Sequence, residues 1–234
     1  MATETSQTTE QERAAYLMDA QTKALKLFEE IEQSIVRPGV SEKQLSDEIH
    51  ELGAKRYDVK THWHKRVIRS GPNTLFPYAE NPPDRVLQPD DIVFVDLGPV
   101  FEAWEADFGR TFVLGNDPIK AKLRDTLEPL WEQVKSRFQA NPDITGEELY
   151  QIVCDLAKES GWEFGNSHAG HLVGQFPHER IAGDKVEYYI TKGSQKPMRR
   201  TGKDGQQLHW ILEVHLVDTA RQIGGFYEQL LTVD

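Results

Sequence analysis

The chain has 234 residues, of which 38% are hydrophobic, enough to bury a substantial core in one large domain or two small ones. Its formal charge is −11, from 27 Lys and Arg against 38 Asp and Glu, which disfavours nucleic acid and anionic membrane surfaces as partners. No apolar run approaches the roughly 20 residues of a membrane helix and residues 1–13 do not resemble a signal peptide, so we expect a cytoplasmic protein.

Two amphipathic helices are predicted after a polar tail, which we place at residues 1–12. Residues 11–35 carry Ala, Leu, Phe and Ile at helical intervals, with charged residues on the other face. Ser41, with Gln44 three positions later, matches a capping box at the start of the second helix. Residues 66–84 are rich in Pro, Gly and Asn, which predicts a loop that could include a short strand, and loops of this kind often carry function.

The strongest strand signal lies at residues 91–115, where two β-rich segments flank a connection that contains Gly98 and Pro99. This pattern predicts a β-hairpin or meander. Further along, the hydrophobic periodicity predicts two helices and then two strands, at residues 118–140, 145–161, 208–218 and 224–234. Thr145, with Glu148 three positions later, matches a capping box at the start of the second of these helices. No repeat or linker divides the chain, so we predict one α+β domain at residues 13–234.

Four carboxylates stand at or inside the predicted strands. Asp96 follows an apolar run, and Asp107 lies eleven positions later, so the two could meet across adjacent strands. Acidic residues at strand ends are also commonly solvated. Glu213 and Glu228 each lie in the middle of an apolar strand, where an unpaired buried charge costs several kcal/mol. A metal ion would compensate that charge, whereas strand alternation could instead point either Glu to solvent.

A segment that contains two His residues supports the prediction of a metal site. GHLVGQFPHE places His171 and His178 seven positions apart, with Gly170 and Gly174 allowing close backbone approach. Imidazole suits a divalent transition metal better than Mg²⁺ or Ca²⁺, although each His alone is also compatible with a hydrogen-bonded structural role. Four carboxylates and one His are what two divalent ions sharing a water would require. The residue types are therefore those that a two-metal centre would need.

The order and context of these residues resemble the pita-bread metallohydrolases, which comprise methionine aminopeptidase, prolidase, Xaa-Pro aminopeptidase and creatinase. The stretch from SGPNTLFPYAEN to DFGRTFVLG is similar to the prolidase and Xaa-Pro aminopeptidase branch. HLVGQFPHE resembles the family's segment with two His, and GGFYEQLLTVD resembles the strand that holds its last metal ligand. The resemblance extends over nearly the whole chain and implies the pita-bread fold, an antiparallel sheet flanked by helices.

The same resemblance implies a ligand set and a reaction. Two divalent ions (Mn, Fe, Co or Zn) would be held by five residues: Asp96, Asp107, His171, Glu213 and Glu228. Asp107 and Glu228 would bridge both ions. A metal-bridging water would attack an amide bond of a small peptide-like substrate, with Glu213 as general base. His178 and Tyr78 would stabilise the oxyanion or position the leaving nitrogen.

Tyr78 departs from the family's pattern. Relatives that work as peptidases carry a substrate-contacting His at this position, about eighteen residues before the first metal-binding Asp. His62 and His64 could approach the site from nearby, and we include His64 with Tyr78 and His178 among the expected substrate contacts. A Tyr hydroxyl can donate a hydrogen bond, but its reference pKa near 10 makes it a poor proton shuttle at neutral pH.

Prolidases and Xaa-Pro aminopeptidases usually carry an additional N-terminal domain, which this chain does not match. We therefore expect substrate selection to come from the loops at residues 62–83 and 183–205, or from the second subunit of a homodimer. Cations in the second loop would form a solvated basic patch or hold a substrate carboxylate, among them Lys192, Lys196, Arg199, Arg200 and Lys203.

Two alternative functions remain open at this stage. The first is a non-peptidase enzyme on the same scaffold, a lyase or a specialised amidohydrolase, in which a Tyr78 phenolate could abstract a carbon-bound proton. The second is a non-catalytic binding module. Members of that second kind usually lose metal ligands, whereas this chain keeps all five.

Overall fold

The structure is a computed structural model that describes residues 8–177, 186–203 and 205–233. Its α-helices are α1 (Glu10–Ser34), α2 (Glu42–Tyr57), α3 (Pro118–Ala140) and α4 (Gly146–Glu159), and its 3-10 helices are η1 (Gly71–Leu75) and η2 (Val186–Tyr188). Its strands are β1 (Val67–Ser70), β2 (Ile92–Leu97), β3 (Val100–Phe101), β4 (Trp104–Glu105), β5 (Phe108–Val113), β6 (Glu163–Phe164), β7 (Leu172–Val173), β8 (His209–Asp218) and β9 (Ile223–Leu230). Helix α1 thus begins inside the stretch predicted as a tail.

Side-chain caps begin the helices where the sequence predicts them. Ser41 Oγ accepts from the backbone N–H of Gln44, whose side chain accepts from the backbone N–H of Ser41 in return. The same reciprocal pair joins Thr145 and Glu148 at the start of α4. Each box satisfies two donors that a helix N-terminus would otherwise leave unpaired, which is why these boundaries could be predicted.

Antiparallel pairing joins the strands into one main sheet, in the order β1-β2-β5-β9-β8-β6, with β7 on β8. The predicted meander at residues 91–115 is present: β2 pairs with β5 from Ile92–Val113 to Leu97–Phe108, and the small β3–β4 hairpin lies between them. Strand β9 pairs along its whole length with residues 211–218 of β8, and the first two residues of β8 pair with β7. The two halves of the sheet meet where β5 pairs with β9.

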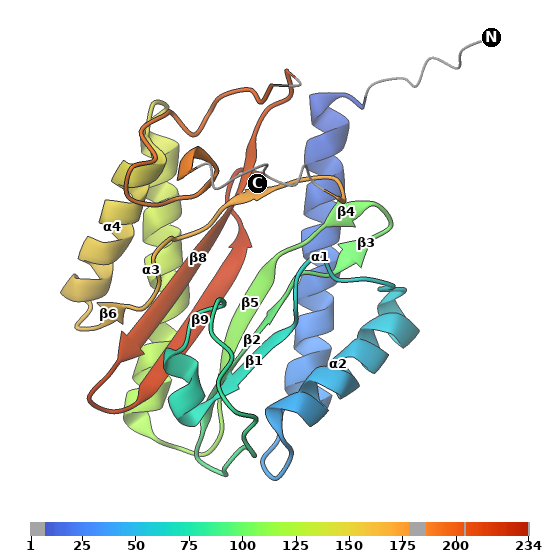
Figure 1. Ribbon diagram of the computed structural model, residues 1–234, viewed down its shortest axis with the longest axis vertical. Coiled ribbons are helices and arrows are strands. Elements are labelled where there is room, and N and C mark those ends of the chain that lie inside the picture. Colours follow the sequence, from blue (N-terminus) through green and yellow to red (C-terminus); the bar gives the residue numbers. More distant parts are fainter. Residues whose placement is uncertain (1–7, 178–185, 204, 234) are drawn as a thin grey trace.

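The two helix pairs cover different halves of the sheet (Figure 1): α1 and α2 lie beside β1, β2 and β5, whereas α3 lies beside β8 and β9 and α4 lies beside α3 and β6. On β2, Val93, Val95 and Leu97 share a core with α1 and α2. On β8, residues 212, 214 and 216 share a core with α3 and α4. Because side chains alternate along a strand, Asp96 and Glu213 point to the opposite face. The sheet therefore has an apolar face under the helices and a face that carries acids.

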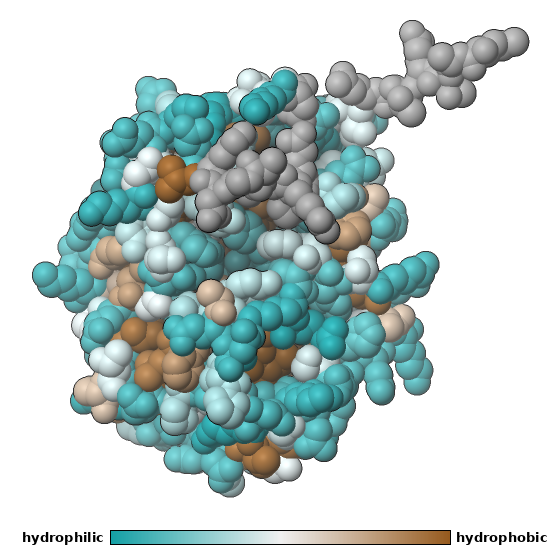
Figure 2. All heavy atoms as spheres, viewed as in Figure 1, coloured by the Kyte–Doolittle hydropathy of each residue, from teal (hydrophilic) through white to brown (hydrophobic). Residues whose placement is uncertain are grey.

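The outer surface agrees with the charged composition. Figure 2 shows a face dominated by hydrophilic residues, with hydrophobic side chains in small separate patches. Within the described ranges, no helix is both long and apolar enough to cross a membrane. The mixture of helices and antiparallel strands matches the predicted α+β class.

Candidate metal centre

One row of paired residues crosses four neighbouring strands. Asp96 on β2 pairs with Gly109 on β5, Gly109 pairs with Glu228 on β9, and Glu228 pairs with Glu213 on β8. Neighbouring strands lie about 4.8 Å apart, so this register brings three carboxylates together on the face away from the helices. A Cβ on Gly109 would lie 2.5 Å from the Phe226 ring and 3.2 Å from the Cβ of Glu228. Glycine therefore leaves space in the middle of the row.

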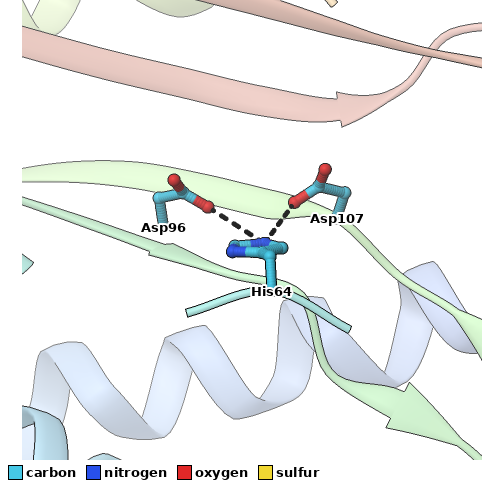
Figure 3. A group of neighbouring side chains, drawn as sticks. All are labelled: His64, Asp96 and Asp107. Carbon is cyan, nitrogen blue, oxygen red and sulfur yellow. Dashed lines mark hydrogen bonds and ion pairs between the residues drawn. The ribbon is translucent and has the colours of Figure 1, made fainter. Parts of the chain in front are cut away.

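Asp107, two residues before Gly109, stands at the centre of this group. Its Oδ1 lies 3.1 Å from Nε2 of His64, and its Oδ2 lies 3.1 Å from Nε2 of His171. Figure 3 shows His64 between Asp107 and Asp96, whose Oδ1 is 3.5 Å from the same Nε2 atom. Two sets of candidate ligand atoms share this one carboxylate: His64, Asp96 and Asp107, and Asp107, His171 and Glu228.

The segment that carries His171 runs along β8. The backbone N–H of Glu213 donates to the carbonyl of Ala169 at 3.1 Å, and that of Ile211 donates to the carbonyl of His171 at 2.9 Å. These bonds place His171 opposite the acidic row. Its Nδ1 donates to the carbonyl of Leu172 at 2.8 Å, so that in the neutral imidazole the lone pair would lie on Nε2, toward Asp107.

His168 also reaches the acidic row, although nothing in its sequence context singles it out. Its Nδ1 lies 2.7 Å from Oε1 of Glu213, without hydrogen-bond geometry. The side-chain amide of Asn166 donates to the other Glu213 oxygen at 3.3 Å. The only available signal was the position of His168 three residues before His171, and that spacing is informative only once the pairing of this segment with β8 is known.

The four carboxylates are buried with little compensation from the protein. Between 2% and 6% of the surface of Asp96, Asp107, Glu213 and Glu228 is exposed. Three of their oxygens, on Asp96, Glu213 and Glu228, are buried and accept no hydrogen bond from the described residues. Burying an ionised carboxylate in this way is costly unless a cation balances it. Oxygen donors together with imidazole fit Mn²⁺, Fe²⁺, Co²⁺ or Zn²⁺, so the residues present suit a divalent metal centre.

Crowding of these charges shifts their pKa values. Burial, reinforced by Asp107, raises the pKa of Asp96 to about 7 although His64 opposes the shift. Burial and the neighbouring carboxylates raise the pKa of Glu228 well above its usual value. For Asp107, burial acts in the same direction, but His64 and His171 outweigh it and hold the pKa below its usual range. Burial opposes protonation of His171, yet Asp107 raises its pKa to about 9.

Metal binding is therefore expected to release protons at pH 7. A ligand must be a neutral imidazole or an ionised carboxylate, whereas the raised pKa values of His171 and Asp96 favour their protonated forms. Affinity should fall as the pH is lowered from 9 towards 6, by up to about tenfold per pH unit for each proton released. Calorimetric titration with Mn²⁺ or Co²⁺ in two buffers of different ionisation enthalpy measures this release. A binding heat that is the same in both buffers would contradict the expectation.

A cavity of about 190 Å³ opens over the acidic row. Besides the row and Asp107, it is lined by aromatic and imidazole side chains: Trp63, His64, Tyr78, His168, His171 and Tyr189. Two of the predicted substrate contacts, His64 and Tyr78, thus lie in the cavity wall. His62 is not among the described residues that line the cavity. His178 lies outside the described residues. The sequence prediction of a substrate pocket at this place therefore rests on Tyr78 and His64.

The cations of the second loop do not line this cavity in the part of the chain that the structure describes. Arg199 donates to the carbonyls of Asn141 and Phe138, both at 2.9 Å. Lys196 pairs with Glu187 at 2.9 Å. The Arg199 guanidinium is therefore occupied by hydrogen bonds to backbone carbonyls at the end of α3.

Solved structures share this architecture. Prolidase from Thermococcus sibiricus superposes with a TM-score of 0.75 at 19% identity, covering 97% of this chain and 57% of that chain. Methionine aminopeptidase from Thermotoga maritima gives a TM-score of 0.64 at 15% identity, covering 97% of this chain and 98% of that chain. At these identities the likeness concerns the fold, and it confirms the predicted pita-bread architecture.

Sequence comparison agrees with the fold. The Xaa-Pro dipeptidase of Lactobacillus helveticus is 27% identical over 146 residues, which cover 62% of this chain and 39% of that protein. The chain thus spans well under half the length of this curated relative. The sequence pattern of metallopeptidase family M24 matches residues 15–215. With this match over most of its length, the chain belongs to metallopeptidase family M24.

Proposed function

We propose that this chain is a dinuclear-metal-dependent hydrolase that cleaves an amide bond in a small peptide-like substrate. The observation that carries the proposal is the position of Asp107, whose two oxygens each lie 3.1 Å from a different imidazole nitrogen. One carboxylate facing two sets of donors is the arrangement expected of a bridge between two ions. The L. helveticus relative is named as an Xaa-Pro dipeptidase, which makes Xaa-Pro peptides the first substrate class to test.

The charge of the site supports two ions. Asp96, Asp107, Glu213 and Glu228 supply four negative charges when ionised, which balance two divalent cations. Bound ions would polarise the scissile carbonyl and lower the pKa of the attacking water. Mn²⁺, Fe²⁺, Co²⁺ and Zn²⁺ all accept this donor set, and availability decides among them.

Glu213 is the proposed general base. It lines the cavity, and one of its buried oxygens accepts no hydrogen bond from the described residues, so that oxygen can take a proton from the attacking water. Asn166 holds the other oxygen at 3.3 Å and limits rotation of the carboxylate. The Asn166 amide thus orients the base and adds no charge of its own.

Tyr78 is the proposed hydrogen-bond donor to the developing oxyanion or the leaving nitrogen, with His178 as a second candidate. Partial burial raises the pKa of Tyr78 above its ordinary value, and Asp96 and Asp107 add to the shift. The phenol therefore stays protonated at neutral pH and can donate. The same shift opposes the lyase alternative, which requires the Tyr78 phenolate as a base.

A substrate screen tests the hydrolase. Protein loaded with Mn²⁺ or Co²⁺ is incubated with Xaa-Pro dipeptides, longer Xaa-Pro peptides and Met-peptides, in water labelled with heavy oxygen. Hydrolysis inserts the label into the new carboxyl group, whereas elimination inserts none. Tyr78→His is run alongside, because activity gained only by this variant would show that the natural substrate lies outside these peptide classes.

Tyr78→Phe is expected to lower kcat by roughly 100-fold on any substrate that the screen identifies, because it removes one donor to the transition state. Metal content should not change, since Tyr78 is not in either set of candidate ligands. Steady-state kinetics on metal-saturated protein provide the measurement. An unchanged kcat would remove Tyr78 from the mechanism and leave the metal centre as proposed.

A further inference from the structure

His64 and His171 occupy equivalent positions on the two sides of Asp107. Each imidazole donates from Nδ1 to the carbonyl of the next residue, at 2.6 Å to Lys65 and at 2.8 Å to Leu172. Each then presents Nε2 to one Asp107 oxygen, at 3.1 Å in both cases. A hydrogen bond from Nδ1 to a carbonyl fixes the tautomer in which Nε2 carries the lone pair, as in a metal-binding His.

The donor atoms around His64 are spaced like the ligands of one ion. Nε2 lies 3.1 Å from the Asp107 oxygen and 3.5 Å from the Asp96 oxygen (Figure 3). Ligands bound at about 2.0–2.2 Å in tetrahedral or octahedral geometry are separated by roughly 3.0–3.5 Å. The same Asp96 oxygen is buried and accepts no hydrogen bond from the described residues. Its lone pairs are therefore available to a cation.

The surrounding structure holds His64 in this position. Only 6% of its side chain is exposed, and its ring meets the edges of the Trp63 and Tyr78 rings, with centroids 4.5 and 5.6 Å away. Gly98 makes the approach possible, because a Cβ there would lie 2.2 Å from Cδ2 and 2.5 Å from Nε2 of His64. The position is thus packed and shaped for the imidazole.

We propose that His64 is a ligand of the ion held by Asp96 and Asp107, so that the centre carries one imidazole on each side of the bridging carboxylate. The inference rests on the metal centre of the proposed function but not on its reaction. A nitrogen donor on this ion would also favour Co²⁺ or Zn²⁺ over harder ions such as Mg²⁺ at that position.

The test compares His64→Gln with His62→Gln, which alters an imidazole of the same loop outside the described cavity wall. Zn²⁺ affinities come from competition with a chelator, and X-ray absorption of Zn²⁺-loaded protein counts the imidazoles per ion. His64→Gln is expected to weaken one of two sites at least about 100-fold, beyond the 10–100-fold typical of residues that only orient a ligand. The imidazole count should also fall, while His62→Gln keeps both properties.

Gly98→Ala is the second variant, because its methyl group would displace the ring while His64 itself stays intact. It should weaken the same site as His64→Gln. If the wild type binds two ions and both variants bind them with unchanged affinity and imidazole count, His64 is not a ligand, although the metal centre stands. A rise in KM with unchanged metal affinity would likewise overturn the proposal in favour of substrate contact. A wild type that binds no metal would overturn the centre and the inference together.

Discussion

Asp107→Asn is expected to abolish binding of both metal ions. The neutral amide has one oxygen instead of two and carries no charge, yet each Asp107 oxygen faces a separate set of donors in the structure. Replacing a residue that only orients a ligand costs about 10–100-fold in metal affinity, so losing the shared ligand should cost at least about 100-fold at each site. Turnover should fall with the metal.

Elemental analysis and calorimetric titration of the purified variant measure this loss. The matched control is Asp117→Asn, at the exposed cap of α3, where Asp117 accepts from the backbone N–H groups of Ile119 and Lys120. Asn caps a helix about as well as Asp, so the control should keep both its fold and its metals. If Asp107→Asn still bound two ions as tightly as the wild type, Asp107 would not be the bridge.

The helices and the β2–β5 meander could be predicted because their signals are local. The capping pairs Ser41–Gln44 and Thr145–Glu148 are three residues apart, and both are present. The predicted helix at residues 118–140 coincides with α3, which starts after the Asp117 cap. Hydrophobic periodicity and end signals are short-range properties, so the sequence alone contains them.

The geometry of the site depends on pairings between residues far apart in the sequence. The acidic row exists because Gly109 on β5 pairs with Glu228 on β9, and no local pattern specifies that neighbour. Residue type and family resemblance identify Asp96 and Glu213 as candidate ligands, but they do not give the distance between the two side chains. Their role as metal ligands remains a prediction, and the structure adds only that their side chains converge.

The positions of two imidazoles, those of His168 and His64, could not be predicted from the sequence. His168 lies against Glu213 only because the segment before β7 pairs with β8. The sequence predicts a substrate contact for His64, and this role remains a prediction, because its Nε2 also lies 3.1 Å from Asp107, between two proposed ligands. Gly98 leaves space for the His64 ring, and this contact is visible only in the folded structure. The role of His178 remains a prediction, because it lies outside the described residues.

Glu213→Gln is expected to lower kcat by about 10²–10⁴-fold, the usual contribution of a positioned general base. Glutamine has nearly the same shape, and its side-chain oxygen can still accept a hydrogen bond from Asn166. The side chain should therefore keep its position. It cannot accept the proton of the attacking water at neutral pH. A loss of kcat without a comparable loss of metal would assign the defect to proton transfer.

The measurement needs metal-saturated protein, because Glu213 is also a proposed ligand and the variant should bind one ion more weakly. The rate is therefore taken at metal concentrations where calorimetry shows both sites filled. Glu163→Gln on β6 is the control, since that side chain is exposed and accepts a hydrogen bond from the Thr219 hydroxyl at 3.2 Å. If Glu213→Gln turned over substrate at the wild-type rate with both ions bound, the general base would be another residue, and His168, 2.7 Å from Glu213, would be the first to replace.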